Sequence, residues 1–81
     1  MEETKEMIDL IENNGYIKKF YGYCKITKNY THWINIYSES IQLYCYLTED
    51  KEMDRCYDSG MININLELLE KLINMWQFNY E

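Results

Sequence analysis

Apolar residues recur with a helical period in two segments, residues 3–14 and residues 65–78. Their spacing of three and four residues places them on one face of a helix in each case. They are Met7, Leu10 and Ile11 in the first segment, and Leu69, Leu72, Ile73 and Trp76 in the second. Gly15 is typical of a helix end, and Asn63 or Asn65 suits the start of the second helix.

Between the two helical segments, the pattern changes to alternation with a period of two. Residues 16–27, 30–38 and 41–48 are rich in Ile, Tyr, Phe, Trp and Thr, which favours three strands. The connections between them are short, so the strands should be antiparallel neighbours. Residues 49–60 are polar and acidic and predict a loop, with room for a short fourth strand near Met53–Tyr57.

The expected order is helix, three strands, helix within a single domain, residues 1–81. The economical fold is two-layer α+β, with a three-stranded antiparallel sheet that gains a fourth strand if the loop supplies one. Both helices are expected on one face of this sheet. The other face then meets water or a partner.

Alternation assigns the strand side chains to two faces of different chemistry. The face expected beneath the helices holds Phe20, Gly22, Cys24, Ile26, His32, Ile34, Ile36, Ile41, Leu43, Cys45 and Leu47. The opposite face holds six aromatic residues, Tyr21, Tyr23, Trp33, Tyr37, Tyr44 and Tyr46. Gly22 would let a helix approach the sheet closely. A shift of one residue in any strand would exchange its two sets.

The aromatic set has a structural interpretation and a functional one. Cross-strand aromatic pairs stabilise a sheet, and tyrosine tolerates water at its hydroxyl. Tyr and Trp also dominate binding hot spots, and on an open sheet they can stack nucleic-acid bases. Lys19 and Lys25 favour nucleic acid, whereas the net charge of −6 opposes it, so a protein partner is the preferred interpretation.

Charge is divided unevenly along the chain. Residues 1–14 carry −4, residues 15–38 carry +4, and residues 39–81 carry −6. A dense group of acids falls in the predicted loop: Glu49, Asp50, Glu52, Asp54 and Asp58. Their spacing does not match a calcium loop. They form either a solvated segment or, with the acids of the first helix, a negative surface for a basic protein groove.

No catalytic, cofactor or metal motif is found in the chain, which predicts a protein that is not an enzyme. Cys24, Cys45 and Cys56 are irregularly spaced, which favours reduced thiols in the cytoplasm over a disulfide framework. The one histidine, His32, falls on the helix-facing side, where a buried residue with a hydrogen-bond partner is expected. No apolar run is long enough for a membrane span, and the acidic start does not resemble a signal peptide.

Ile, Tyr, Asn and Lys make up 34 of the 81 residues, and Pro, Ala and Val are absent, a bias typical of AT-rich bacterial genomes and their phages. With its length, acidity, element order and the acidic stretch from Glu49 to Asp58, the chain resembles small phage-encoded anti-CRISPR and anti-restriction inhibitors. The resemblance implies a stoichiometric inhibitor in the cytoplasm of a bacterial host. Its carboxylates would replace phosphates in the nucleic-acid groove of a defence nuclease.

Two alternatives stay open at this point. One is a module that binds RNA or single-stranded DNA on the aromatic face, with bases stacked on Tyr and Trp. The other is a homodimeric structural protein that uses the same face for a second copy of the chain. None of the three functions requires a cofactor.

Overall fold

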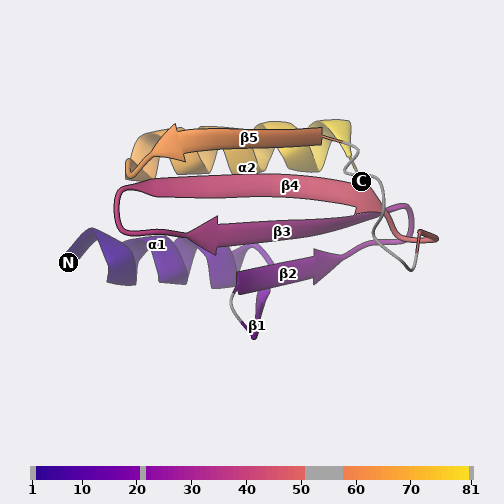
Figure 1. The fold of residues 1–81 in the computed structure, drawn as a ribbon, viewed down its shortest axis with the longest axis horizontal. Helices are drawn as coiled ribbons and strands as arrows, with labels where there is room; N and C mark the ends of the chain where they lie inside the picture. The colour runs from indigo at the N-terminus through magenta and orange to yellow at the C-terminus, as the bar shows by residue number, and fades with distance from the viewer. Residues whose placement is uncertain (1, 21, 51–57, 81) are drawn as a thin grey trace.

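A five-stranded antiparallel sheet flanked in sequence by two helices forms the fold in the computed structural model, which describes residues 2–20, 22–50 and 58–80. The elements are α1 Glu2–Asn13, β1 Ile17–Lys19, β2 Gly22–Ile26, β3 Tyr30–Ile36, β4 Ser40–Leu47, β5 Asp58–Asn63 and α2 Leu66–Asn79. The strand order is β1-β2-β3-β4-β5, so each strand pairs with its neighbours in sequence (Figure 1).

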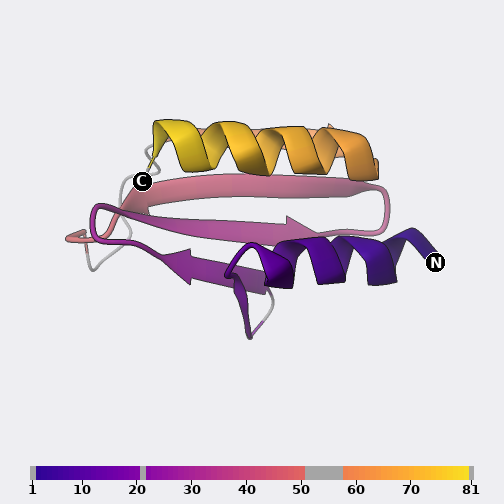
Figure 2. The same cartoon turned by 180° about the vertical axis from the view of Figure 1, so that it is seen from behind.

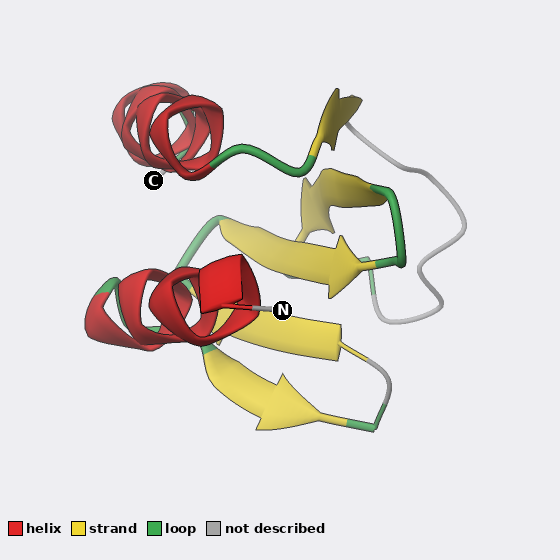
Figure 3. Cartoon of the chain, turned by 90° about the vertical axis from the view of Figure 1, so that its left-hand side faces the viewer, coloured by secondary structure: helices red, strands yellow, loops and turns green. Residues whose placement is uncertain are grey.

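Both helices lie on the same face of the sheet, which gives the molecule two layers (Figure 3). Seen from the helical side, α1 and α2 begin at the same end of the sheet and run in the same direction (Figure 2). The predicted α+β fold is confirmed, with five strands where the sequence predicts three or four. The last strand, β5, begins at Asp58. The expected fourth strand near Met53–Tyr57 lies wholly before β5, outside the described residues.

The first helix ends where the sequence predicts. Gly15 adopts a left-handed backbone with φ of 92°, which glycine reaches at no steric cost. The N–H of Gly15 donates to the carbonyl of Glu12 at 3.0 Å, and that of Tyr16 donates to the carbonyl of Ile11 at 3.3 Å. These two bonds form a Schellman motif, and they turn the buried Tyr16 back over the end of the helix.

The second helix has a side-chain cap at its start. The side chain of Asn65 accepts a hydrogen bond from the N–H of Leu68 at 3.0 Å, which confirms one of the two predicted caps. At the other end, the N–H of Tyr80 donates to the carbonyl of Trp76 at 2.8 Å. Both ends of α2 are therefore fixed by local hydrogen bonds.

The hydrophobic core lies between the helices and the sheet. Its buried members are Met7 and Ile11 of α1, Tyr16, Tyr23, Ile34, Ile41, Leu43 and Cys45 beside or within the sheet, and Leu69, Ile73 and Trp76 of α2. This set confirms the predicted inner positions of Ile34, Ile41, Leu43 and Cys45 and most of the predicted helical faces. Leu10, Ile36 and Leu72 are partly buried against it, and Leu47 is not part of it.

The first expected strand, 16–27, is divided by a reversal of the chain. Lys19 pairs directly with Gly22, so the turn between β1 and β2 contains only two residues. Phe20 in this turn has a left-handed backbone with φ of 47°, and its side chain is 91% exposed. Because paired residues of a hairpin share a face, a two-residue turn inverts the alternation in the strand that follows it.

The inversion corrects the predicted faces of β2. Tyr23 lies opposite Ile34 and is buried in the core, not on the outer face. Cys24 lies opposite Trp33 on the outer face, and Ile26 is exposed. The prediction is wrong because it extends one alternation through the whole of 16–27.

Gly22 serves a purpose different from the predicted one. It lies on the outer face, away from the helices, and a Cβ there would collide with the side-chain oxygen of Asn35. Its lack of a side chain makes room for Asn35 on the neighbouring strand.

The corrected phase of β2 predicts a sharp difference between two aromatic residues of similar size. Replacing Tyr23 by Ala should lower the free energy of unfolding by about 3 kcal/mol, because it removes a core side chain. Replacing Phe20 by Ala should change it by less than about 0.5 kcal/mol. Equilibrium urea unfolding measures both. An equal loss for the two variants would contradict the phase found here.

Candidate functional site

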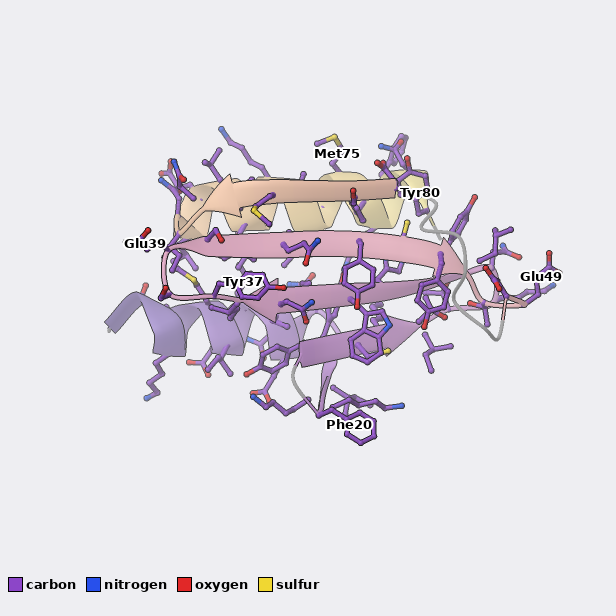
Figure 4. All side chains as sticks on the ribbon, in the orientation of Figure 1. Phe20, Tyr37, Glu39, Glu49, Met75 and Tyr80 are labelled. Atoms are coloured by element: carbon purple, nitrogen blue, oxygen red, sulfur yellow. The ribbon has the colours of Figure 1, made fainter. Side chains whose placement is uncertain are left out.

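The structure separates the carboxylates that the sequence groups together. Glu49 is exposed at one end of the molecule, and Asp50 is half-buried (Figure 4). Glu52 and Asp54 lie outside the described residues. Asp58 has moved from the predicted loop to the first position of β5.

Asp58 acts as a structural link. One carboxylate oxygen accepts a hydrogen bond from the N–H of Ser59 at 2.8 Å. The other accepts from the hydroxyl of Tyr80 at 2.7 Å, which joins β5 to the end of α2. Because both oxygens already accept hydrogen bonds within the protein, this carboxylate has a structural role and is poorly placed to pair with a partner's cations.

The predicted aromatic face is partly assembled. On the outer face of the sheet, Cys24, Trp33 and Tyr46 form a buried cluster, with Tyr44 packed against it. The rings of Trp33 and Tyr44 are stacked, with centroids 6.4 Å apart and planes 11° from parallel. The indole N–H of Trp33 donates to the hydroxyl of Tyr46 at 3.1 Å. Tyr37 is exposed, and its hydroxyl donates to the side-chain oxygen of Gln42 at 3.1 Å.

This cluster leaves little ring surface for a ligand. Trp33 and Tyr46 are each only 8% exposed. Tyr23 lies in the core, and Tyr21 is outside the described residues. Base stacking needs open ring faces. The described rings therefore serve mainly to stabilise the sheet by cross-strand packing.

A hollow of about 290 Å³ adjoins the aromatic cluster. Its lining residues are Lys19, Cys24, Ile26, Thr31, Trp33, Tyr46, Thr48 and Asp50. Burial raises the pKa of the Cys24 thiol, which outweighs the opposite influence of Lys19, so the thiol stays protonated and weakly nucleophilic. Cys24 and Cys45 lie on opposite faces of the sheet, with Cys45 in the core beneath the helices.

A second hollow, of about 280 Å³, lies on the helical side. Its lining residues are Lys25, Thr27, His32, Gln77 and Tyr80. His32 is buried there, and its Nε2 donates to the backbone carbonyl of Tyr80 at 2.7 Å. Its Nδ1 is buried and has no hydrogen-bond partner among the described residues. The sequence-based expectation of a buried, hydrogen-bonded histidine is confirmed.

Five carboxylates form an acidic surface on the helical layer. They are Glu6, Asp9 and Glu12 of α1, and Glu67 and Glu70 of α2, and all five are exposed. Within the part of the chain that the structure describes, none has a hydrogen bond or an ion pair. The sequence predicts a role for the acids of the first helix but overlooks Glu67 and Glu70. Their positions on the polar side of the second helical pattern are the signal that identifies them.

A metal centre and a membrane-spanning helix place different requirements on the described residues. No three His, Cys, Asp or Glu side chains among them could hold a metal ion together. Neither of the described helices has the length and apolarity needed to cross a bilayer. Comparison of the chain with family models, with curated proteins and with solved structures found no match.

The environment of His32 predicts a pH dependence of stability. Burial lowers the pKa of His32 below its usual 6.5, and the nearby positive charge of Lys25 lowers this pKa further. The hydrogen bond to the carbonyl of Tyr80 raises the pKa but does not cancel the decrease. The unfolded chain therefore takes up a proton at a higher pH than the folded one, and the free energy of unfolding should fall as pH drops below 6.5. Urea unfolding at pH 7.5 and at pH 5.5 measures the loss. In a His32→Gln variant the difference between the two pH values should shrink, and an unchanged difference would contradict the assignment.

Proposed function

We propose that this protein is a non-enzymatic inhibitor that occupies the nucleic-acid-binding groove of a basic partner protein. The observation that carries the proposal is the acidic surface of the helical layer, with exposed and unpaired carboxylates on both helices. Lys5 and Lys71 are the only cations that the two helices contain. The other described lysines, at 18, 19, 25 and 28, lie on or next to β1 and β2.

The helical layer is suited to imitate a phosphate backbone. Glu6, Asp9 and Glu12 follow one another at three-residue intervals, so their Cα atoms rise by roughly 4.5 Å per step along the axis. Glu67 and Glu70 repeat the interval on α2. Carboxylates held on rigid helices can accept charge-assisted hydrogen bonds from Arg and Lys without first being ordered. Complementary charge also increases the rate of association.

The nature of the partner follows from the sequence resemblance. Small acidic phage inhibitors imply a bacterial defence nuclease, encountered in the cytoplasm of the host. The carboxylates of the helices support this proposal better than those of the predicted loop, because Asp58 is engaged with Tyr80 and Ser59. Direct binding of RNA or single-stranded DNA is less well supported, since Trp33 and Tyr46 are buried and the exposed acids would repel phosphate.

The proposal predicts that inhibition depends on the helical acids. A variant with Glu6, Glu12, Glu67 and Glu70 changed to Gln and Asp9 to Asn should bind a candidate nuclease at least about tenfold more weakly, since each lost charge-assisted bond is worth about 1.5–3 kcal/mol. Exposed substitutions of this kind cost little stability, which circular dichroism and thermal melting can verify. Titration of the nuclease against labelled guide or target strand, with and without inhibitor, measures the effect.

A matched control uses acids of the strand connections. Changing Glu39 and Glu49 to Gln also removes exposed carboxylates, but at the two ends of the sheet and not on the helices (Figure 4). This control should inhibit as the unmodified protein does. An equal loss of binding free energy per removed charge in both variants would point to net charge alone. Tight binding of the unmodified protein to the free strand would overturn the inhibitor proposal.

A further inference from the structure

The two edges of the sheet are built differently. β1 has only three residues, Ile17–Lys19, and two of them are exposed lysines. A short, charged edge strand discourages pairing with another chain. β5 at the other edge has six residues, Asp58–Asn63, with neither lysine nor proline. Among the described residues, no strand pairs with its outer side.

The pairing register shows which groups of β5 point outward. The N–H of Tyr37 donates to the carbonyl of Ser40 at 2.8 Å, so the even-numbered residues of β4 bond to β3. Because bonding sides alternate along a strand, the odd-numbered residues of β4 bond to the even-numbered residues of β5. The backbone groups of Met61 and Asn63 therefore point to the free edge. The N–H of Ser59 is already bonded to Asp58.

An apolar flank accompanies this edge. Leu68, Met75 and Phe78 of α2 are exposed, and Phe78 is 83% exposed. Gln77 bonds to Asn14 at the end of α1, and Leu68 and Met75 lie roughly 160–180° around the helix from Gln77, on the flank away from α1. Phe78 lies opposite the buried Leu69 and faces away from the sheet. Met75 lies at the margin of the molecule beyond β5 (Figure 4). Met61 of β5 is also exposed.

We propose that this edge accepts an extended, apolar segment of another protein as a sixth strand paired with β5. The backbone groups of Met61 and Asn63 would provide the hydrogen bonds, as in other cases of strand addition. Every second side chain of the added strand would face the helical layer and contact the flank of Leu68 and Met75. A large side chain opposite Gly60 fits there, because Gly60 leaves an open position beside the ring of Trp76.

A lone segment fits this edge better than a second copy of the chain. α2 lies level with β5 (Figure 3), so a second copy paired through its own β5 would bring its α2 against this one. Packed helix axes need about 8–10 Å, whereas paired strands are only about 5 Å apart. Glu67 and Lys71 lie on the side of α2 that faces away from the sheet, so the flank of Leu68 and Met75 is mainly apolar and is suited to an uncharged segment.

Amide hydrogen exchange of the full chain tests the proposal. The probe is the synthetic peptide acetyl-Lys-Thr-Ile-Thr-Ile-Thr-Lys-amide, and the control peptide has both Ile replaced by Ser. In the free protein, the amides of Met61 and Asn63 should exchange rapidly and those of Gly60 and Ile62 slowly. The Ile peptide at saturation should slow Met61 and Asn63 by at least about tenfold, and the Ser peptide should not.

Two variants distinguish backbone pairing from simple hydrophobic contact. Met61→Pro removes an outward N–H without taking a bond from β4, and edge positions tolerate proline. It should abolish the protection at Asn63, whereas Met61→Ala should retain it. If Met61→Pro does not fold, Leu68→Ser with Met75→Ser should weaken peptide binding. Absence of protection with the Ile peptide overturns the proposal. Slow exchange at Met61 together with a doubled mass in the free protein assigns the edge to a second copy and also overturns it.

This edge is independent of the acidic surface on the helices. The variant that neutralises the five helical acids should leave the protection by the Ile peptide unchanged. Failure of nuclease inhibition and failure of strand addition are thus separate results.

Discussion

Burial of one face of the sheet beneath two helices is the constraint on which the other features depend. Ile34 and Leu43 in the central strands lie against a layer that includes Ile11, Leu69 and Ile73. Each such side chain contributes roughly 1.5–3 kcal/mol when removed from water. Since both helices cover this face, no helix is left to bury the side chains on the opposite face of the sheet. On that opposite face, Trp33, Tyr44 and Tyr46 pack against one another instead. The exposed carboxylates of the helices lie on the helical side of the molecule, away from this cluster.

A set of contacts near the end of the chain holds the second helix in place over the sheet. The backbone carbonyl of Tyr80 accepts from His32 on β3, and its hydroxyl donates to Asp58 on β5. The ring of Tyr80 also meets those of Tyr30 and Trp76 edge-on, with centroids 5.3 and 5.6 Å away. A single residue therefore connects α2 to two strands that are not adjacent. The acids on α2 owe their fixed position partly to this residue.

The sequence predicts most of the fold because its signals are local. The apolar stripes give both helices, and Gly15 and Asn65 mark an end and a start that the structure confirms. The phase of β2 could not be obtained this way, since Phe20 resembles a strand residue and nothing nearby signals a reversal. The position of β5 was equally difficult to predict, because Asp58, Ser59 and Gly60 have low strand propensity. They form a strand by pairing with β4, which is a tertiary contact. The structural role of Asp58 could not be predicted for a similar reason: its partner, Tyr80, is 22 residues away in the sequence.

The inequality of the two sheet edges also limits how the protein can assemble. A chain with two open edges can pass strand pairing from copy to copy, and such head-to-tail contacts grow into filaments when the rotation does not close. Here the two lysines of the short β1 strand disfavour pairing at that edge, so head-to-tail growth through both edges is disfavoured. The unequal edges therefore favour a limited assembly over a continuous sheet, because a strand that paired with β5 would leave only the charged β1 edge for further growth.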